Sequence, residues 1–260
     1  MPTPEFLFSH RFPGMIWNTL ADEPAGLLAL EVRDDSVFNT SFSLFDYTAN
    51  TFLFKSILLP EQWWVSLAGV SRHTVFVNRF MNKGGNPDQK SLIAIDATLG
   101  NTRWEVESFS FFDMQEGAVL GYRTKGDPQQ AKIDLTTGVL TECDWEPREA
   151  AARTERLRPA FYAEGSQHFE TVKEFLKRTD YEIVKGVEYL EFNDWIIMSV
   201  YADESAKLAN YLLVFTREGS LALSAKLGEN LAGLGTDTFF VLSGCLFLVQ
   251  NKTDLAAYRL

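Results

Sequence analysis

Short apolar runs, separated by turns rich in glycine, asparagine and aspartate, dominate this chain from end to end. Most runs span five to eight residues and either alternate with polar positions or are apolar throughout, a pattern that predicts β-strands. Tight turns such as Asn193-Asp194 and Ser243-Gly244 join successive strands into hairpins. The strands fall into groups of four, and the chain is therefore predicted to be all-β.

One short motif recurs along the chain, in which a strand ends at a tight turn and another strand-like run follows. Its copies are marked by the residue that precedes the turn, namely Asp46, Asp96, Asp134, Thr216 and Arg259. Most successive copies lie roughly 40–50 residues apart, which is the period of propeller blades and similar arrays. The interval between Asp134 and Thr216 is about twice as long, so it holds either two units or one unit with an insert.

The repeats predict a small β-propeller of about five four-stranded blades, with six blades as the alternative. The chain ends in mid-unit after Arg259, and residues 5–12 resemble the outer strands that follow the other turns. We expect this N-terminal strand to complete the last blade and close the ring, because closure removes exposed sheet edges. Residues 1–260 are then expected to form a single domain.

Residues 145–180 break the strand pattern. Ser166 precedes an apolar stripe at helical spacing, made of Phe169, Val172, Phe175 and Leu176. Residues 146–156 are also helix-like, so we predict a helical insert between blades three and four. The stripe should dock on blade three or four and place the helix over one rim of the ring. The alternative is a degenerate sixth blade built around residues 159–163 and 169–175.

The charge of the chain disfavours two classes of partner. It carries 24 Lys and Arg against 35 Asp and Glu, a net charge of −11, whereas nucleic acids and anionic membranes bind positive surfaces. No apolar run approaches the length of a membrane span, and the N-terminus lacks the pattern of a signal peptide. We therefore expect a cytoplasmic protein that binds neither nucleic acid nor membrane.

Few residues suggest chemistry. The repeated Asp46, Asp96 and Asp134 precede tight turns, where an aspartate accepts hydrogen bonds from turn amides, so their recurrence favours a structural role. The two cysteines, Cys143 and Cys245, are best explained as small core residues. The three histidines and two cysteines have no metal-ligand spacing, so neither a metal nor a cofactor is expected.

An enzyme remains the alternative hypothesis. Glycoside hydrolysis needs two or three convergent carboxylates, and a propeller could gather them at its channel mouth. Candidates near strand ends are Asp22, Asp34, Asp113, Asp194 and Asp237. A ring with many acidic residues places some of them there by chance, so we favour a non-enzymatic protein over a glycosidase-like hydrolase.

A ligand or partner surface is expected from two features. Tryptophans could form an aromatic platform, although most should pack within sheets; they are Trp17, Trp63, Trp64, Trp145 and Trp195. The insert is the stronger oddity, because unusual insertions often carry binding. We therefore expect the surface at Arg158, Tyr162 and His168, together with Trp64. The leading hypothesis is an interaction or ligand-binding module whose partner is an unidentified protein or small molecule.

Residues 94–104, Ala-Ile-Asp-Ala-Thr-Leu-Gly-Asn-Thr-Arg-Trp, resemble the repeat of quinoprotein-type and WD40-like propellers. Residues 132–138 repeat the first half without the tryptophan. The resemblance implies blade geometry only, since no cofactor residues match. The whole chain also resembles an uncharacterised propeller-like family of Bacteroidetes, through residues 161–165, 187–191 and 238–242. That likeness implies a bacterial source and no particular activity.

Overall fold

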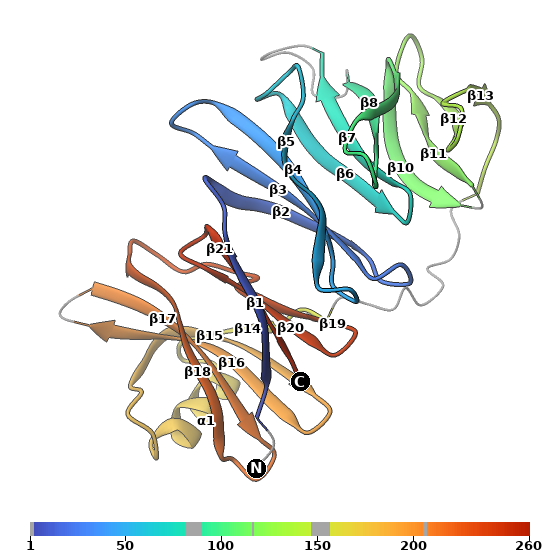
Figure 1. Cartoon of the computed structure of the whole chain (residues 1–260). Helices are drawn as coiled ribbons and strands as arrows, with labels where there is room; N and C mark the ends of the chain where they lie inside the picture. Colours follow the sequence, from blue (N-terminus) through green and yellow to red (C-terminus); the bar gives the residue numbers. More distant parts are fainter. Residues whose placement is uncertain (1–2, 82–89, 116, 147–156, 205–206) are drawn as a thin grey trace. The chain divides into compact units, whose positions relative to one another are not determined.

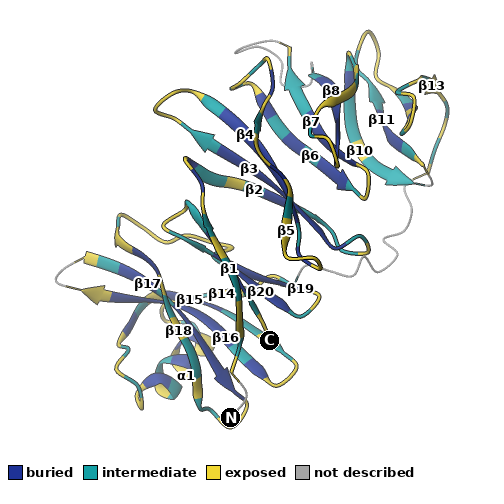
Figure 2. Cartoon of the chain, in the orientation of Figure 1, coloured by how far each residue is buried: buried dark blue, intermediate teal, exposed yellow. Residues whose placement is uncertain are grey.

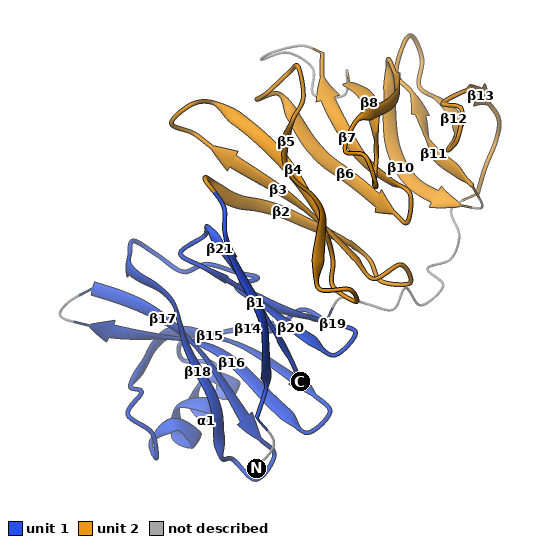
Figure 3. Ribbon diagram, in the orientation of Figure 1, with its two compact units in different colours: residues 1–12, 155–260 blue, residues 13–154 orange. Residues whose placement is uncertain are grey.

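The computed structural model describes residues 3–81, 90–115, 117–146, 157–204 and 207–260. These residues form 21 strands and one helix (Figure 1). The strands make five antiparallel sheets, which confirms the all-β prediction. Two compact units divide the chain (Figure 3): unit 1 comprises residues 1–12 and 155–260, and unit 2 comprises residues 13–154. The expectation of one domain over residues 1–260 stays a prediction.

Unit 2 contains three four-stranded sheets, and each sheet is a meander in chain order. The first sheet consists of β2 (Met15–Asp22), β3 (Leu27–Asp34), β4 (Asn39–Asp46) and β5 (Thr51–Leu58). The second consists of β6 (Val65–Ser71), β7 (Thr74–Phe80), β8 (Lys90–Asp96) and β9 (Thr102–Val106). The third consists of β10 (Phe109–Gln115), β11 (Ala118–Arg123), β12 (Gln129–Asp134) and β13 (Leu140–Glu142).

Unit 1 contains two sheets and the helix α1 (Gln167–Leu176). The fourth sheet consists of β14 (Ala160–Ala163), β15 (Ile183–Phe192), β16 (Trp195–Glu204), β17 (Lys207–Thr216) and β18 (Leu221–Leu231). The fifth consists of β19 (Phe239–Leu242), β20 (Cys245–Gln250), β21 (Asp254–Arg259) and β1 (Glu5–Arg11). The N-terminal strand β1 thus pairs antiparallel with β21, which is the pairing expected from the sequence.

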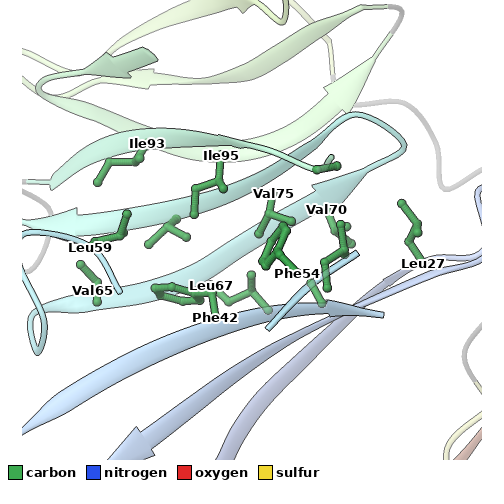
Figure 4. Packing of buried hydrophobic residues seen from close by; sticks show 14 residues of the cluster. Leu27, Phe42, Phe54, Leu59, Val65, Leu67, Val70, Val75, Ile93 and Ile95 are labelled. Atoms are coloured by element: carbon green, nitrogen blue, oxygen red, sulfur yellow. The ribbon is translucent and has the colours of Figure 1, made fainter. Parts of the chain in front are cut away.

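The core lies between the faces of neighbouring sheets. Middle strands such as β4 and β8 are buried over almost their whole length, so both of their faces are covered (Figure 2). Side chains from the first and second sheets interlock in one cluster, which includes Phe42, Leu67 and Ile93 (Figure 4). Comparable clusters join the second sheet to the third and the fourth sheet to the fifth.

One face of the third sheet carries exposed polar residues, unlike the covered faces of the other sheets' middle strands. On β12, Ala131 and Ile133 are buried among residues of the second and third sheets, whereas Lys132 and Asp134 are exposed. The strand therefore alternates between apolar and polar positions, as a half-buried strand does. Burial does not alternate in this way on β4 or β8, whose inner positions are all buried.

Helix α1 covers one face of the fourth sheet. It begins after Ser166, whose side-chain oxygen accepts a hydrogen bond from the Phe169 amide at 3.3 Å. Three residues of the stripe are buried, Phe169, Val172 and Leu176, while Phe175 is half-buried. They pack on residues that share one face of the sheet: Val187, Met198, Val200, Leu213 and Phe215. The helix therefore contacts a face of the fourth sheet. Its placement over one rim of a ring stays a prediction.

Other parts of the predicted insert have different outcomes. Residues 147–156, which hold most of the first helix-like stretch, lie outside the described residues. Residues 160–163 form β14 and pair with β15. This short strand is thus part of the fourth sheet. No helix among the described residues has the length and apolar character required to cross a membrane.

The recurring aspartates hold the turns, as the sequence predicts. Oδ1 of Asp96 accepts hydrogen bonds from the Thr98 and Leu99 amides, both at 2.8 Å. Asp46 and Asp134 accept the same pair of turn amides in their own hairpins. The Leu99 amide, with the other donors around it, holds the pKa of Asp96 below its ordinary value. These carboxylates are structural residues.

At two of the repeated turns, a glycine lies against a side chain from the preceding element. A Cβ atom on Gly138 would lie 2.6 Å from Cγ of Trp104, whose Nε1 donates to the Leu135 carbonyl at 3.1 Å. The tryptophan of the second sheet therefore rests on the turn of the third. At the equivalent turn in unit 1, the Arg178 guanidinium, just beyond α1, lies against Gly219. In unit 1 the segment just after α1 therefore makes the contact with the turn that a preceding sheet makes in unit 2.

Candidate functional site

A β-bulge in β2 presents a tryptophan to solvent. The pairing of β2 with β3 shifts by one residue between Ile16 and Asn18, so that Trp17 is the extra residue. Bulges re-aim side chains and are common beside functional sites. Trp17 is 62% exposed, an unusual state for the largest apolar side chain.

A fixed arginine lies against this tryptophan. The Arg33 guanidinium carbon is 5.2 Å from the centre of the Trp17 ring and 5.4 Å from that of Trp63, which are cation–π distances. Nε donates to Glu31 at 2.7 Å, and Nη2 donates to the Val65 carbonyl at 2.8 Å. The Arg33 side chain is only 17% exposed, so its position is set by β3 and β6 together.

Buried Glu31 anchors the arginine. Its side chain is 1% exposed, and its second oxygen accepts a hydrogen bond from the Leu67 amide at 2.8 Å. A buried carboxylate of this kind is stabilised when both oxygens have donors. Glu31 therefore fastens the first sheet to the second and orients Arg33 toward the two indole rings.

The loop between β3 and β4 adds a second exposed aromatic ring. Phe38 has φ of 53°, in the left-handed region that bulky residues avoid. It is 65% exposed, and its ring meets Trp63 edge-on with centroids 5.3 Å apart. Asp34 accepts hydrogen bonds from the amide and hydroxyl of Ser36, which tightens the loop. Backbone strain that serves no core packing is a pointer to function.

The segment between β5 and β6 positions the neighbouring tryptophans. The amides of Trp63 and Trp64 both donate to Oε1 of Glu61 at 3.1 Å, and the Trp64 carbonyl accepts from the Phe80 amide at 2.8 Å. Trp64 is itself exposed. We name Trp17, Arg33, Phe38 and Trp63 the Arg33 aromatic cluster, and Trp64 is next to it in sequence.

A second aromatic group lies on the third sheet. Phe112 is the bulge residue of β10, in a register shift between Phe111 and Asp113. Its ring lies 4.8 Å from that of Trp145, which in turn lies 5.4 Å from the Tyr122 ring. The Trp145 indole donates to the Gly121 carbonyl at 3.3 Å. These rings cover one another, so less of their surface is free than in the Arg33 aromatic cluster.

The residues singled out in the insert belong to unit 1. Arg158 forms an ion pair with Asp237 at 2.7 Å, and the Tyr162 and His168 rings lie 4.6 Å apart. The structure therefore brings Tyr162 and His168 together, while Trp64 belongs to unit 2. Among the other tryptophans, Trp195 is buried in the core of unit 1.

A buried polar network surrounds Glu188 in the fourth sheet. This carboxylate accepts hydrogen bonds from the Asp237 amide at 2.5 Å and from the Thr238 amide at 3.2 Å. The Thr238 hydroxyl also donates to it and lies 2.8 Å from Oγ of Ser199. Burial raises the pKa of Glu188 above its ordinary value. The network fastens the start of β19 to the fourth sheet, much as Glu31 fastens the second sheet to the first.

The carboxylates proposed for hydrolysis have structural partners. Asp22 accepts from the Ala25 amide within its own turn, and Asp34 from Ser36. Asp194 lies 3.9 Å from the Arg217 guanidinium, and Asp237 pairs with Arg158. The fifth candidate, Asp113, lies on β10. It belongs to unit 2, and so do Asp22 and Asp34. Among the described residues no group of three or more His, Cys, Asp or Glu side chains could hold a metal ion.

Sequence reasoning singled out Trp17, Trp63 and Trp64 but missed Arg33, Glu31 and Phe38. The signal for Glu31 was its place as a charged residue inside an apolar strand. An unpaired buried charge is costly, so such a residue is expected to have a partner. Arg33 follows two residues later on the same strand. Phe38 carried no signal, because a phenylalanine is not expected at positive φ.

The repeated four-stranded meanders, the N-terminal strand in the last sheet and the side chains that rest on neighbouring turns define a β-propeller-like repeat protein. Residues 21–104 match a family described as a domain of unknown function, DUF4905. No protein with a curated description matches the sequence.

Several solved propeller-type structures are similar to the chain. The β-propeller domain of the trilobed protease from Pyrococcus furiosus matches over 94% of this chain and 65% of its own length, with 10% identity and a TM-score of 0.35. BamB from Moraxella catarrhalis matches over 100% and 98%, with 12% identity and a TM-score of 0.31. A europium-containing methanol dehydrogenase matches over 96% and 52%, with 11% identity and a TM-score of 0.33.

Proposed function

We propose that this chain is a non-enzymatic interaction module and that the Arg33 aromatic cluster is its binding surface. One observation carries the proposal. A β-bulge exposes Trp17 and a strained loop exposes Phe38, and both lie around Arg33, which a hydrogen bond to Glu31 holds in place. Tryptophan and arginine, with exposed aromatic neighbours, are the residues that dominate protein–protein binding energy.

Burial of the exposed rings by a partner would contribute hydrophobic free energy to binding. An aromatic side chain buries about 150–250 Å² when fully covered. With more than 60% of Trp17 and Phe38 exposed, a partner that covers them gains roughly 3 kcal/mol per ring at about 25 cal/mol per Å². Fixing the rings in advance also lowers the entropic cost of binding.

The same proposal extends to architecture. We infer five blades, one for each sheet, with a helical insert between the third and the fourth. The packing of α1 on the fourth sheet and the contact of Arg178 with Gly219 support that insert. The N-terminal strand completes the fifth blade. A bacterial cytoplasmic protein whose partner is neither nucleic acid nor membrane remains part of this proposal.

The hydrolase alternative is the weaker proposal. A glycosidase needs a carboxyl group free to donate a proton and a second carboxylate nearby. Four of the five candidate aspartates instead accept turn hydrogen bonds or lie beside arginines. Their contacts account for them without catalysis.

A peptide library tests the binding surface. A phage-displayed library of random peptides is selected on the wild-type protein and counter-selected on the Trp17→Ala variant. Peptides that survive should bind the wild type and lose about 30-fold in affinity on Trp17→Ala, which corresponds to about 2 kcal/mol for a hot-spot residue.

The matched control is Phe112→Ala, which removes an exposed bulge aromatic from another sheet of the same unit and should leave the affinity unchanged. Phe38→Gly should weaken binding yet raise the melting temperature, because glycine relieves the strain at positive φ. If no peptide survives counter-selection, or if both alanine variants bind equally, the proposed surface is wrong.

A further inference from the structure

The chain adds an extended segment to its own sheet edges in unit 1. Strand β14 pairs antiparallel with β15, the first strand of the fourth meander, from Ala160 opposite Tyr189 to Ala163 opposite Gly186. Three residues earlier, Leu157 exchanges two backbone hydrogen bonds with Val241 of β19, at 3.0 and 2.9 Å. Residues 160–163 therefore pair with the edge of the first strand of the fourth sheet, and Leu157 bridges to the edge of the first strand of the fifth.

The described residues of unit 2 provide no such cover for the corresponding edges. Strands β2, β6 and β10 are each the first strand of a meander and the terminal strand of their sheet. Among the described residues of this unit, no strand pairs with their outer edges. A terminal strand presents unpaired amide and carbonyl groups, which an extended peptide can use.

The three edges differ in the side chain that the bulge of each strand presents. The bulge residue of β6 is Ala68, which offers little surface. The bulge residue of β10, Phe112, already packs against Trp145. The bulge residue of β2 is Trp17, which belongs to the Arg33 aromatic cluster. Of the three edges, only β2 combines a terminal position with a large ring that is mostly exposed.

We propose that the outer edge of β2, around residues 15–18, receives an extended peptide as an added antiparallel strand. This inference rests on the proposed function, because the peptide would place alternate side chains on Trp17 and Phe38. Main-chain hydrogen bonds to the edge supply affinity, and the aromatic cluster supplies the side-chain preference.

The chemistry of the occupant follows from two observations. The segment that fills the equivalent edges in unit 1 reads Leu-Arg-Pro-Ala-Phe-Tyr-Ala, with aliphatic and aromatic residues and one cation. The chain as a whole carries a net charge of −11, which attracts cationic partners. The expected partner is an extended peptide that is rich in aliphatic and aromatic residues and carries positive charge.

The experiment uses the peptide with the highest affinity from the library selection. A series of synthetic versions carries a single N-methyl group at each backbone position in turn, and their affinities for the intact protein are measured by calorimetry. In an added strand, every second amide faces the edge. N-methylation should therefore weaken binding by about 10-fold or more at alternate positions and have little effect at the positions between. Hydrogen exchange of the fragment that covers β2 should slow when the peptide binds.

The outcomes separate this inference from the proposed function. Binding that needs Trp17 but tolerates N-methylation at every position overturns strand addition and leaves the aromatic surface standing. Binding weakened at alternate positions, with slower exchange on another first strand and not on β2, also overturns the assignment to β2. The absence of any peptide that depends on Trp17 overturns both. A peptide version with its cation replaced by glutamate should bind more weakly, and equal binding refutes the charge preference.

Discussion

The turn after β12 has room for glycine alone, and replacing Gly138 with alanine tests how neighbouring sheets fit together. Gly138 has φ of 73°, where an L-side chain is strained. Its Cβ would lie 2.6 Å from Cγ and 2.8 Å from Cβ of Trp104. The tryptophan has little freedom to withdraw, because its indole donates to the Leu135 carbonyl.

The cost of Gly138→Ala has two parts. The left-handed conformation costs about 1 kcal/mol for alanine, and forcing the Trp104 ring aside costs about 1–3 kcal/mol, as overpacking does elsewhere. Together they predict a loss of roughly 2–4 kcal/mol. The control is Gly126→Ala, since Gly126 has φ of 83° but nothing within 4 Å of its Cβ position. Only the conformational cost of about 1 kcal/mol applies there.

Urea unfolding followed by far-ultraviolet circular dichroism measures both losses. The double variant Trp104→Ala with Gly138→Ala should show a favourable coupling, because the smaller side chain leaves room for the new methyl group. If Gly138→Ala and Gly126→Ala lose the same stability, or if the double variant shows no coupling, the account of Trp104 resting on this turn is wrong.

Three further predictions concern other parts of the fold. Phe169→Ala should cost about 3–5 kcal/mol because Phe169 is fully buried, and half-buried Phe175 should cost clearly less on substitution by alanine; equal losses in urea unfolding contradict the docking of α1. The Leu99 amide and other donors lower the pKa of Asp96 below 3.8, so the stabilisation by its carboxylate is present above that pH and lost as pH falls through the lowered value. The difference in unfolding free energy between wild type and Asp96→Ala should therefore shrink in acid. A difference that stays constant counts against the turn hydrogen bonds. Deleting residues 1–12 leaves the edge of β21 unpaired, so light scattering should reveal aggregation, and a soluble truncation with unchanged melting refutes the role of β1.

Much of the fold could be predicted from the sequence because the signals were local. The Asp96 motif specifies a strand end and its turn within a few residues, and the same pattern recurs at Asp134. The sequence indicates residues 160–163 only as part of an alternative sixth blade, and their place as β14 of the fourth sheet depends on pairing with β15. The position of α1 on a sheet face likewise depends on Met198 and Leu213, which lie far from it in sequence.

The candidate site divides in the same way. Trp17 and Trp63 could be singled out, since clustered tryptophans suggest a binding surface. Their common contact with Arg33 depends on β3 and β6 lying side by side, which the sequence does not specify residue by residue. The bulge that exposes Trp17 is a property of strand register, and register follows from the whole sheet.

The pairing of β1 with β21 has a consequence for the time course of synthesis. Arg11 and Asp254 form an ion pair at 2.9 Å across 243 positions of sequence. At about 5–20 residues per second, a ribosome needs roughly 10–50 s to pass from one to the other. Throughout that interval β1 is an unpaired strand on a nascent chain. Its charged residues Glu5 and Arg11 then discourage edge-to-edge association until its partner emerges.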